Sequence, residues 1–430
     1  MTLSIQEAMD KGTGEVEIHG WVYRERGSNK LRFLVIRDYS NIIQCVIEKD
    51  KVDEQTWKDA TEKASIEAAV QVKGNIKPDQ RAPGGYEITV KTLEIVGESH
   101  TYPITKDQSP EFLLDMRHLW VRSRKLNAVF KIRHTLFQAF REYFNTQGFF
   151  ESHMPMFTPT ACEGGSTLFP VKFFNDTVYL AQSWQLYAES VVSSLEKIYT
   201  ISPCFRAEKS RTSRHLAEFW MAEMEQAWAD LDIVIGHAEA CVSYMVQQVV
   251  EKNERELLVL EQDIEKLKKI KTPFPRITYT EALELLKKKE GMKIEWGKDL
   301  RTVEEDLLTK HFDRPVIVTH YPREIMAFYK QPDPENKKVA LCFDMLAPEG
   351  FGEIIGGSQR DTDIHRLIEA LNRQGEPLKN YEWYLDLRRF GSVPHAGWGL
   401  GMERVIAWVC KLDNIKDTIP FPRTMLRKSP

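Results

Sequence analysis

An arginine at the end of an apolar run is the first feature of this chain that suits the binding of an anion. Arg206 closes the run IYTISPCF, and Glu208, Arg214 and His215 follow it in a polar, basic loop. The planar guanidinium group of an arginine can bind a phosphate or a carboxylate through two parallel hydrogen bonds. A surface ion pair at a hairpin would explain the same pattern about half the time, so this segment alone does not define a site.

The strand that we expect after this loop carries two further carboxylates. Side chains alternate between the two faces of a strand, so Glu223 and Glu225 share one face with Met221. The same return strand passes through the apolar residues Ala222 and Met224.

Three glycines alternate with larger residues near the end of the chain, just before Glu403 and Arg404. Gly397, Gly399 and Gly401 would let a backbone or a flat ring approach closely. A simple turn into the following helix is the alternative. The spacing does not match the GxGxxG pattern of a dinucleotide-binding fold.

A pair of carboxylates precedes a Gly-Gly pair in the segment FDMLAPEGFGEIIGGSQR. An apolar strand is expected to deliver Asp344 and Glu353, and Arg360 closes the segment. Carboxylates near phosphate-binding arginines are suitable ligands for Mg²⁺, which prefers oxygen ligands and shares them with phosphates. Ordinary acidic residues at loop ends are the alternative.

Length and composition indicate a multidomain globular protein. The chain has 430 residues, of which 42% are hydrophobic and 28% are charged. The six cysteines form no CxxC pair, which argues against a zinc ribbon and a disulfide framework. Neither a transmembrane stretch nor a signal peptide is evident, so we expect a cytoplasmic protein without a membrane partner. The net charge of -4 does not indicate nucleic-acid binding, although a local basic track would suffice for it.

Residues 1–97 contain five short runs with apolar alternation, and the helix-like segment TWKDATEKA separates the third run from the fourth. This order is typical of an OB-fold β-barrel, with another small barrel or sandwich as the alternative. Residues 98–114 lack periodicity and contain Pro103 and Pro110, which predicts a linker.

Residues 115–430 combine amphipathic helices with apolar strands. A long helix is predicted over SRKLNAVFKIRHTLFQAFREYF, and a charged helical insertion is predicted around residues 231–330. The segments RPVIVTH, KVALCFDML and EWYLDLRR are predicted strands. Helices and strands do not alternate strictly, so we expect an α+β domain with an antiparallel sheet flanked by helices.

Taken in order, these segments resemble the class II aminoacyl-tRNA synthetases. A proline-ended motif 1, QGFFESHMPMFTPT, precedes an FRxE motif 2 with a basic loop and a G-x-G-x-G-x-E-R motif 3. The resemblance covers essentially the whole chain, and an OB-fold before these motifs is similar to the subgroup for aspartate, asparagine and lysine. The segments CEGGSTLFPV, LAQSWQLYAE and EIIGGSQR resemble the aspartyl/asparaginyl branch, and within it the asparaginyl enzymes.

The resemblance implies ATP-dependent activation of an amino acid, its transfer to the 3′ end of a tRNA, a Mg²⁺ cofactor and a homodimer. Arg206 and Arg404 are the implied catalytic residues, at the α-phosphate and the γ-phosphate. Asp344 and Glu353 are the implied metal ligands, and Gly356 stands where a serine often helps to hold Mg²⁺. The implied ATP-binding residues are Arg206, Glu208, Arg214, His215, Leu216, Glu353, Gly401, Glu403 and Arg404.

Within that branch, the amino-acid pocket favours L-asparagine. Aspartyl enzymes carry a lysine after QLY, and here that residue is Ala188. A buried carboxylate without a cation is poorly compensated, whereas a carboxamide needs only hydrogen bonds. Glu223 could accept a hydrogen bond from the amide NH₂ while Arg360 donates to the amide oxygen. Glu163 and Gln185 are the implied contacts of the α-amino group.

In the predicted barrel, the resemblance assigns recognition of the tRNA(Asn) anticodon to Phe33 and Gln44. Phe33 would stack on a base and Gln44 would bind a base edge. A core phenylalanine is the alternative for Phe33, because barrel strands alternate inward and outward side chains.

Three other functions stay open. They are an aspartyl-tRNA synthetase of relaxed tRNA specificity, a tRNA-independent asparagine synthetase paralogue, and a non-catalytic tRNA-binding protein. Ala188 and Glu223 argue against the first, and the predicted OB-fold argues against the second. The presence of Arg206, Glu353 and Arg404 argues against the third.

Overall fold

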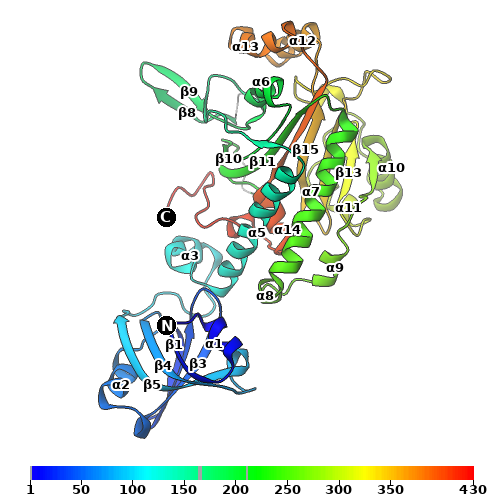
Figure 1. Ribbon diagram of the computed structural model, residues 1–430. Helices are drawn as coiled ribbons and strands as arrows, with labels where there is room; N and C mark the ends of the chain where they lie inside the picture. Colours follow the sequence, from blue (N-terminus) through cyan, green and yellow to red (C-terminus); the bar gives the residue numbers. More distant parts are fainter. Residues whose placement is uncertain (1, 163–166, 210–211) are drawn as a thin grey trace. The chain divides into compact units, whose positions relative to one another are not determined.

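The computed structural model describes residues 2–162, 167–209 and 212–430 (Figure 1). The chain divides into two compact units, Met1–Met116 and Arg117–Pro430. The segment predicted as a linker, residues 98–114, lies in the first unit, and its end belongs to helix α3 (Pro110–Asp115).

The first unit is built on a closed β-barrel with strand order β1-β2-β3-β5-β4. The β3–β5 pair is parallel and the other pairs are antiparallel. Helix α2 (Glu54–Lys58) lies between β3 and β4 in the chain, so the predicted OB-fold is confirmed. The strands are β1 (Gly14–Gly27), β2 (Leu31–Arg37), β3 (Ile42–Glu48), β4 (Ala69–Pro78) and β5 (Tyr86–Gly97).

Alternation along β2 decides which side chains fill the barrel. Leu34 and Ile36 lie in its apolar core, whereas Phe33 is half-buried and does not belong to that core. A short helix that the sequence analysis did not predict, α1 (Ile5–Lys11), begins with a capping box between Ser4 and Glu7. It buries one apolar face against the barrel.

The second unit contains an eight-stranded sheet of order β12-β13-β14-β15-β16-β11-β10-β6. Its inner pairs are antiparallel, and the β12–β13 and β10–β6 pairs at its edges are parallel. The strands are β6 (Phe150–Glu151), β10 (Lys197–Phe205), β11 (Glu218–Ala227), β12 (Arg276–Thr278), β13 (Val316–Thr319), β14 (Cys342–Ala347), β15 (Gly352–Gln359) and β16 (His395–Gly401). A small sheet is formed by β7 (Phe157–Thr158), β8 (Pro170–Phe173) and β9 (Asp176–Leu180).

Helices flank the large sheet, as the α+β prediction requires. The long helix α5 begins after the N-cap Ser123, and together with α7 it covers one face of the sheet (Figure 1). Helix α7 is long and apolar enough to cross a membrane, but 50% of its apolar window is buried in this core. The helices are α4 (Arg117–Trp120), α5 (Arg124–Thr146), α6 (Gln185–Leu195), α7 (Leu231–Lys252), α8 (Glu254–Val259), α9 (Ile264–Lys268), α10 (Tyr279–Glu290), α11 (Thr302–Thr309), α12 (Ile364–Gln374), α13 (Leu378–Arg389) and α14 (Met402–Val409).

Two segments differ from the prediction. EWYLDLRR, predicted as a strand, lies in helix α13. Its alternating apolar residues imitate a strand, but α13 buries one helical face, formed by Tyr381, Tyr384, Leu385 and Arg388. The region around residues 231–330 contains β12 and β13 as well as helices α7 to α11, and both strands extend the large sheet.

The two faces of the central strands have different chemistry. Ala222 of β11 packs into the core under α5 and α7, whereas Glu223 and Glu225 line a cavity. On the neighbouring β16, glycines occur opposite these carboxylates. A side chain at Gly397 would collide with Glu225, so a glycine is required there.

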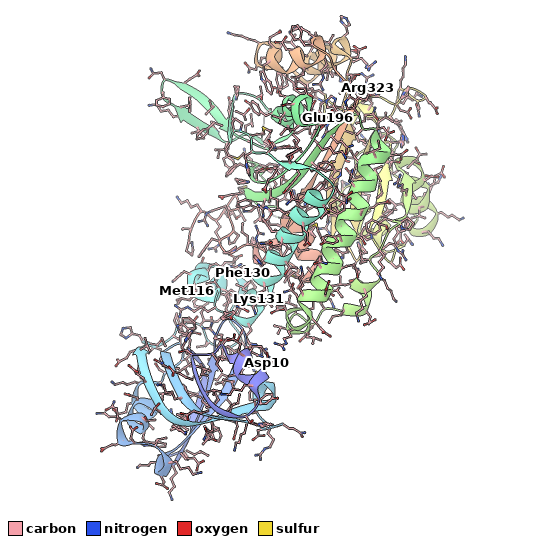
Figure 2. All side chains as sticks on the ribbon, in the orientation of Figure 1. Asp10, Met116, Phe130, Lys131, Glu196 and Arg323 are labelled. Carbon is pink, nitrogen blue, oxygen red and sulfur yellow. The ribbon has the colours of Figure 1, made fainter. Side chains whose placement is uncertain are left out.

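The turn between α6 and β10 has a specific backbone conformation. Helix α6 is followed by Glu196, whose φ of 60° lies in the left-handed region (Figure 2). This turn directs the chain from α6 into β10, the strand that leads to Arg206.

Candidate active site

A cavity at the end of the β10–β11 hairpin brings together all of the residues that the sequence analysis assigned to ATP. Motif 2 contributes its wall through the end of β10 and the following loop, and motif 3 contributes through β16 and α14. The assigned residues that line it are Arg206, Glu208, Arg214, His215, Leu216, Glu353, Gly401, Glu403 and Arg404.

Two arginines place positive charge in this cavity. The guanidinium of Arg206 lies 5.5 Å from the ring centroid of Phe219. Arg404, in the first turn of α14, donates from Nη1 to the carboxylate and to the carbonyl oxygen of Glu353, each at 2.9 Å. Burial alone would raise the pKa of Glu353, but Arg404 and Arg206 hold it below its usual value. The cavity is therefore suited to polyphosphate.

The loop after motif 2 is held by helix α11. Arg214 donates from Nη2 to Asp306 at 2.6 Å and also to the carbonyl oxygen of Gly350. Its Nη1 lies 3.7 Å from Glu305. Burial and the negative charge of Glu353 raise the pKa of Glu305 to about 7. Glu305 could not be predicted from the sequence, because α11 belongs to no motif and an acidic helix normally faces solvent.

Three other residues of the cavity, Glu208, His215 and Glu403, have partners inside the protein. His215 lies 3.3 Å from Glu208, and burial lowers the pKa of His215. Glu403 accepts hydrogen bonds from Arg133 of α5 at 2.7 Å and from the backbone N–H of Trp220 at 2.9 Å. Glu403 thus anchors α14, which carries Arg404, to α5 and β11.

A second cavity adjoins the first along the sheet. The two share the lining residues Arg206, Met221, Glu353 and Gly399. The second cavity also contains Gln185, Glu223 and Arg360, which the sequence analysis assigned to the amino acid. Of the other assigned residues, Glu163 lies outside the described residues.

Ala188 has a different position from the one that we expected. It is fully buried in an apolar cluster with Trp184 and Val192, and it is not among the described residues that line the second cavity. Its neighbours on the chain, Trp184 and Gln185, line the cavity instead. The resemblance placed Ala188 where aspartyl enzymes carry a lysine, and the short side chain of the alanine ends in the apolar cluster.

Asp344 and Glu353 form a pair of carboxylates at the wall of the second cavity. A Cβ atom on Gly356 would lie 3.1 Å from Glu353 Oε1 and 3.5 Å from Asp344 Oδ1, so the two carboxylates converge on this glycine. Burial and the charge of Glu353 raise the pKa of Asp344 to about 8. Converging oxygen ligands with unfavourable mutual repulsion fit a divalent cation.

At the other end of the second cavity, Glu223, Glu225 and Arg360 already have hydrogen-bond partners inside the protein. Glu223 accepts from the Ser183 hydroxyl at 2.6 Å and from the Trp184 backbone N–H at 3.0 Å. Arg360 donates through Nε and Nη2 to the two oxygens of Glu225, at 2.9 and 2.7 Å. Burial disfavours the charge of Arg360, yet Glu225 raises the arginine's pKa above its ordinary value. The role of Glu225 was not assigned from the sequence, because its partner is distant in the chain.

In the barrel, Phe33 and Gln44 share the outer face. Phe33 pairs with Val46 and Val35 pairs with Gln44 in the β2–β3 ladder, so the two residues are diagonal neighbours. The guanidinium of Arg26 lies 5.0 Å from the Phe33 ring centroid, and it donates to Gln44 Oε1 at 3.5 Å. The alternative of a core phenylalanine does not agree with this position.

Family models match both units of the chain. The model of the class II tRNA synthetases for D, K and N matches residues 109–425, and that of the OB-fold nucleic acid binding domain matches residues 16–96. The chain therefore belongs to the class II tRNA synthetases of the D, K and N group.

Within this group, the chain is similar to individual asparagine--tRNA ligases over nearly its full length. The asparagine--tRNA ligase of Thermoplasma acidophilum is 46% identical over 430 residues, which are 100% of both chains. That of Thermococcus kodakarensis is 48% identical over 417 residues, 97% of this chain and 96% of the relative. The crystal structure of asparaginyl-tRNA synthetase from Pyrococcus horikoshii complexed with asparaginyl-adenylate has a TM-score of 0.96 to this structure, with 46% identity and 100% coverage of both chains.

Proposed function

We propose that this chain activates L-asparagine with ATP and transfers it to the 3′ end of tRNA(Asn). The observation that carries this proposal is the junction of the two cavities at Arg206 and Glu353. One cavity has the cationic lining that phosphates need, and the other has the polar groups that an amino acid needs. The full-length similarity to asparagine--tRNA ligases supports the choice of substrate.

The proposed reaction has two steps. An oxygen of the asparagine carboxylate attacks the α-phosphorus of ATP, the bond to the bridging oxygen breaks, and pyrophosphate leaves. A hydroxyl of the terminal tRNA ribose then attacks the activated carbonyl, and AMP leaves. No general base is needed for the first step, because the carboxylate is already ionised, so positioning and charge neutralisation provide the catalysis.

Arg206 lines both cavities, which supports a position at the α-phosphate, the atom where the two substrates are joined. Arg404, at the start of α14, lines the first cavity and is not among the described residues that line the second, which supports binding of the γ-phosphate. Asp344 and Glu353 would hold Mg²⁺, which neutralises phosphate charge when it is bound. The convergence of both carboxylates on Gly356 supports this assignment.

The charge of the second cavity favours a carboxamide over a carboxylate. The charge of Arg360 is balanced by Glu225, so Arg360 can donate a hydrogen bond without attracting a second carboxylate strongly. Glu223 accepts hydrogen bonds from two neutral groups, the Ser183 hydroxyl and the Trp184 backbone N–H. An aspartate side chain would add a further negative charge between Glu223 and Glu225.

Anticodon recognition is proposed for the outer face of the barrel. Phe33 offers an aromatic ring that is half-buried, and beside it lies Gln44, which is 7% exposed and donates from Nε2 to Glu87 at 3.2 Å. Base stacking on such a ring contributes about 1–3 kcal/mol per base. We further propose that the protein acts in the cytoplasm.

We also propose a homodimer formed through residues 124–160. Phe150 lies on the edge strand β6 and is 57% exposed, although it is large and apolar. Two-fold dimers bury such patches against their own copy. Sedimentation at micromolar concentration should show a dimer, and Phe150→Asp should shift it toward the monomer while Phe390→Asp, at another exposed phenylalanine, should not. A wild-type monomer of 50.0 kDa would contradict this proposal.

The function is tested by ATP–pyrophosphate exchange with asparagine and aspartate in parallel, followed by charging of tRNA(Asn). We expect activation of asparagine about a thousandfold more efficiently than of aspartate, because an uncompensated buried carboxylate costs several kcal/mol. Equal activation of both amino acids would favour an aspartyl enzyme of relaxed specificity. Activation of aspartate without tRNA charging would favour a tRNA-independent asparagine synthetase paralogue.

A further inference from the structure

A single buried carboxylate near the second cavity accepts hydrogen bonds from four side chains. Glu189 of α6 has a side chain that is 0% exposed. Its Oε2 accepts from Arg388 Nη2 at 2.6 Å and from the Tyr384 hydroxyl at 2.7 Å, and it lies 3.0 Å from His395 Nε2. Its Oε1 accepts from Gln185 Nε2 at 3.1 Å. These partners come from α6, α13 and β16, so Glu189 links elements that are far apart in the chain.

The charges in this cluster balance one another. His395 Nδ1 lies 2.8 Å from the carbonyl oxygen of Val393, and its Nε2 faces Glu189. Both ring nitrogens therefore face oxygen atoms of other residues. Burial would raise the pKa of Glu189, but Arg388 and His395 together hold it well below its usual value. Glu189 is thus an ionised acceptor that pairs with the guanidinium of Arg388.

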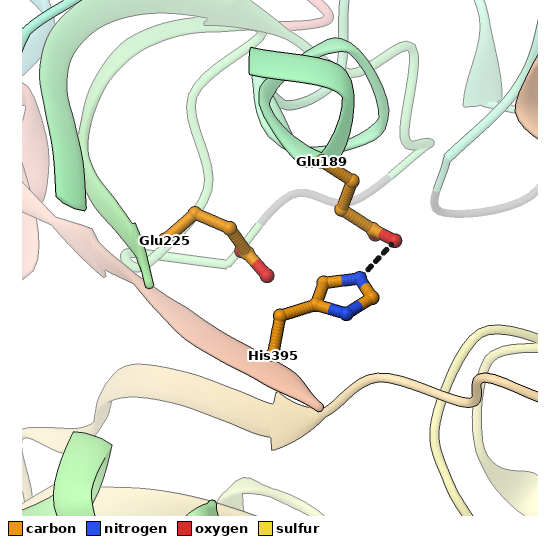
Figure 3. A group of neighbouring side chains, drawn as sticks. All are labelled: Glu189, Glu225 and His395. Carbon is orange, nitrogen blue, oxygen red and sulfur yellow. Dashed lines mark hydrogen bonds and ion pairs between the residues drawn. The ribbon is translucent and has the colours of Figure 1, made fainter. Parts of the chain in front are cut away.

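The same cluster has the residue types of a metal site. Ligand atoms of Glu189, Glu225 and His395 all lie within 4.8 Å of one another, and Figure 3 shows the three side chains converging. However, Glu189 already accepts from the guanidinium of Arg388, and both oxygens of Glu225 accept from Arg360. The two guanidinium groups supply the positive charge that a metal ion would bring. The geometry thus favours a network that orients side chains.

The partners of Glu189 hold the backbone at Arg360. Arg388 Nε donates to the carbonyl oxygen of Asp361 at 3.0 Å. The backbone N–H of Arg360 donates to the carbonyl oxygen of His395 at 2.9 Å. Two separate routes therefore run from Glu189 to the main chain of the arginine that faces the substrate side chain. The side chain of Arg360 is then aligned by Glu225.

We propose that Glu189 is a positioning residue for recognition of the asparagine side chain, acting through Arg388 and His395 on Arg360. This inference rests on the proposed function of the second cavity. Loss of the carboxylate leaves Arg388 buried without its charge partner, and the guanidinium must move toward another acceptor. The carbonyl of Asp361 and the backbone of Arg360 then shift with it. Small misplacements of a binding group weaken recognition strongly.

Glu189→Gln in the full-length protein tests this proposal by ATP–pyrophosphate exchange. We expect the KM for asparagine to rise about 10- to 100-fold, whereas the KM for ATP and the kcat per active site stay within about threefold. Glu239→Gln is the matched control, because Glu239 is also buried on a helix of this unit and pairs with Arg276 and the Phe274 backbone. The control should leave the KM for asparagine within about twofold.

Arg388→Lys removes the hydrogen bond to the Asp361 carbonyl and keeps a positive charge beside Glu189. A lysine keeps a positive charge near Glu189 but lacks the Nε–H that binds Asp361, so the KM for asparagine should again rise selectively. This variant decides the question if Glu189→Gln does not fold. An unchanged KM for asparagine, or equal rises in the KM values for asparagine and ATP, would overturn the proposal. Failure of the wild-type protein to activate asparagine would instead overturn the proposed function.

Discussion

The ion pairs of the two cavities in the second unit differ in how far they are exposed to solvent. In the first, the ion pair of Arg404 and Glu353 leaves the two side chains 30% and 37% exposed. In the second, Arg360 and Glu225 are 4% and 1% exposed, and in the network that supports Arg360 the side chains of Arg388 and Glu189 are both 0% exposed. Exposed cations can bind a polyphosphate, whereas buried and balanced pairs present hydrogen bonds without net charge. The contrast explains how one sheet can bind a highly charged nucleotide beside a neutral carboxamide.

Loss of an arginine from the first cavity is expected to have the largest effect. Arg206→Ala and Arg404→Ala should each reduce asparagine activation by roughly 2–5 kcal/mol, which is roughly thirtyfold to several thousandfold, because each removes a charged phosphate contact. Pyrophosphate exchange measures this loss, and thermal unfolding checks that the fold stays intact. Arg276→Ala, at an ion pair that is partly exposed, is the control and should retain activity. Near-normal exchange in either site variant would remove that arginine from the ATP site.

Breaking the charge balance of the second cavity should have the next largest effect. Glu225→Gln leaves Arg360 without a compensating carboxylate, so the pocket gains net positive charge and should accept aspartate better. We expect the preference for asparagine to fall by about a hundredfold, since the energies of desolvated charge pairs reach a few kcal/mol. Activation of both amino acids is measured at fixed ATP and Mg²⁺. Glu218→Gln, at the exposed start of the same strand, should keep the wild-type preference.

A substitution on the barrel should have a smaller effect, and this effect should be confined to tRNA charging. Phe33→Ala should reduce the kcat/KM for tRNA(Asn) charging about tenfold, because one stacked base is lost at about 1–3 kcal/mol. Asparagine activation without tRNA should be unaffected, since both cavities lie in the second unit. Tyr39→Ala, at an aromatic residue that is 68% exposed in the β2–β3 turn, is the control. Equal losses in charging and activation would indicate a structural role for Phe33.

The first cavity could be predicted from the sequence to a large extent. Its residues occur in short segments, around Arg206 and around Arg404, where strand and loop geometry brings neighbours together. Glu305 could not be predicted because α11 contacts Arg214 of this cavity only through the tertiary fold. The helix α13 escaped because apolar residues that alternate locally fit a strand as well as a helix.

The second cavity could be predicted only in part. Glu223, Gln185 and Arg360 were identified from the resemblance, and the structure brings them together. Ala188 was expected in the pocket, but it packs into an apolar cluster. A lysine introduced there would therefore enter an apolar core, and Glu225 is the better residue at which to change the charge of the pocket.

By itself, the sequence determined the OB-fold barrel, the antiparallel sheet and the order of the synthetase motifs, because alternation and motif spacing are local properties of the chain. The tertiary structure alone decided which charges are paired in the second cavity. Glu225 and Arg360 are separated by 135 residues, and Glu189 and Arg388 by 199. A carboxylate in a sequence shows only its charge, whereas its partner, its burial and hence its free energy depend on which distant strand or helix folds beside it.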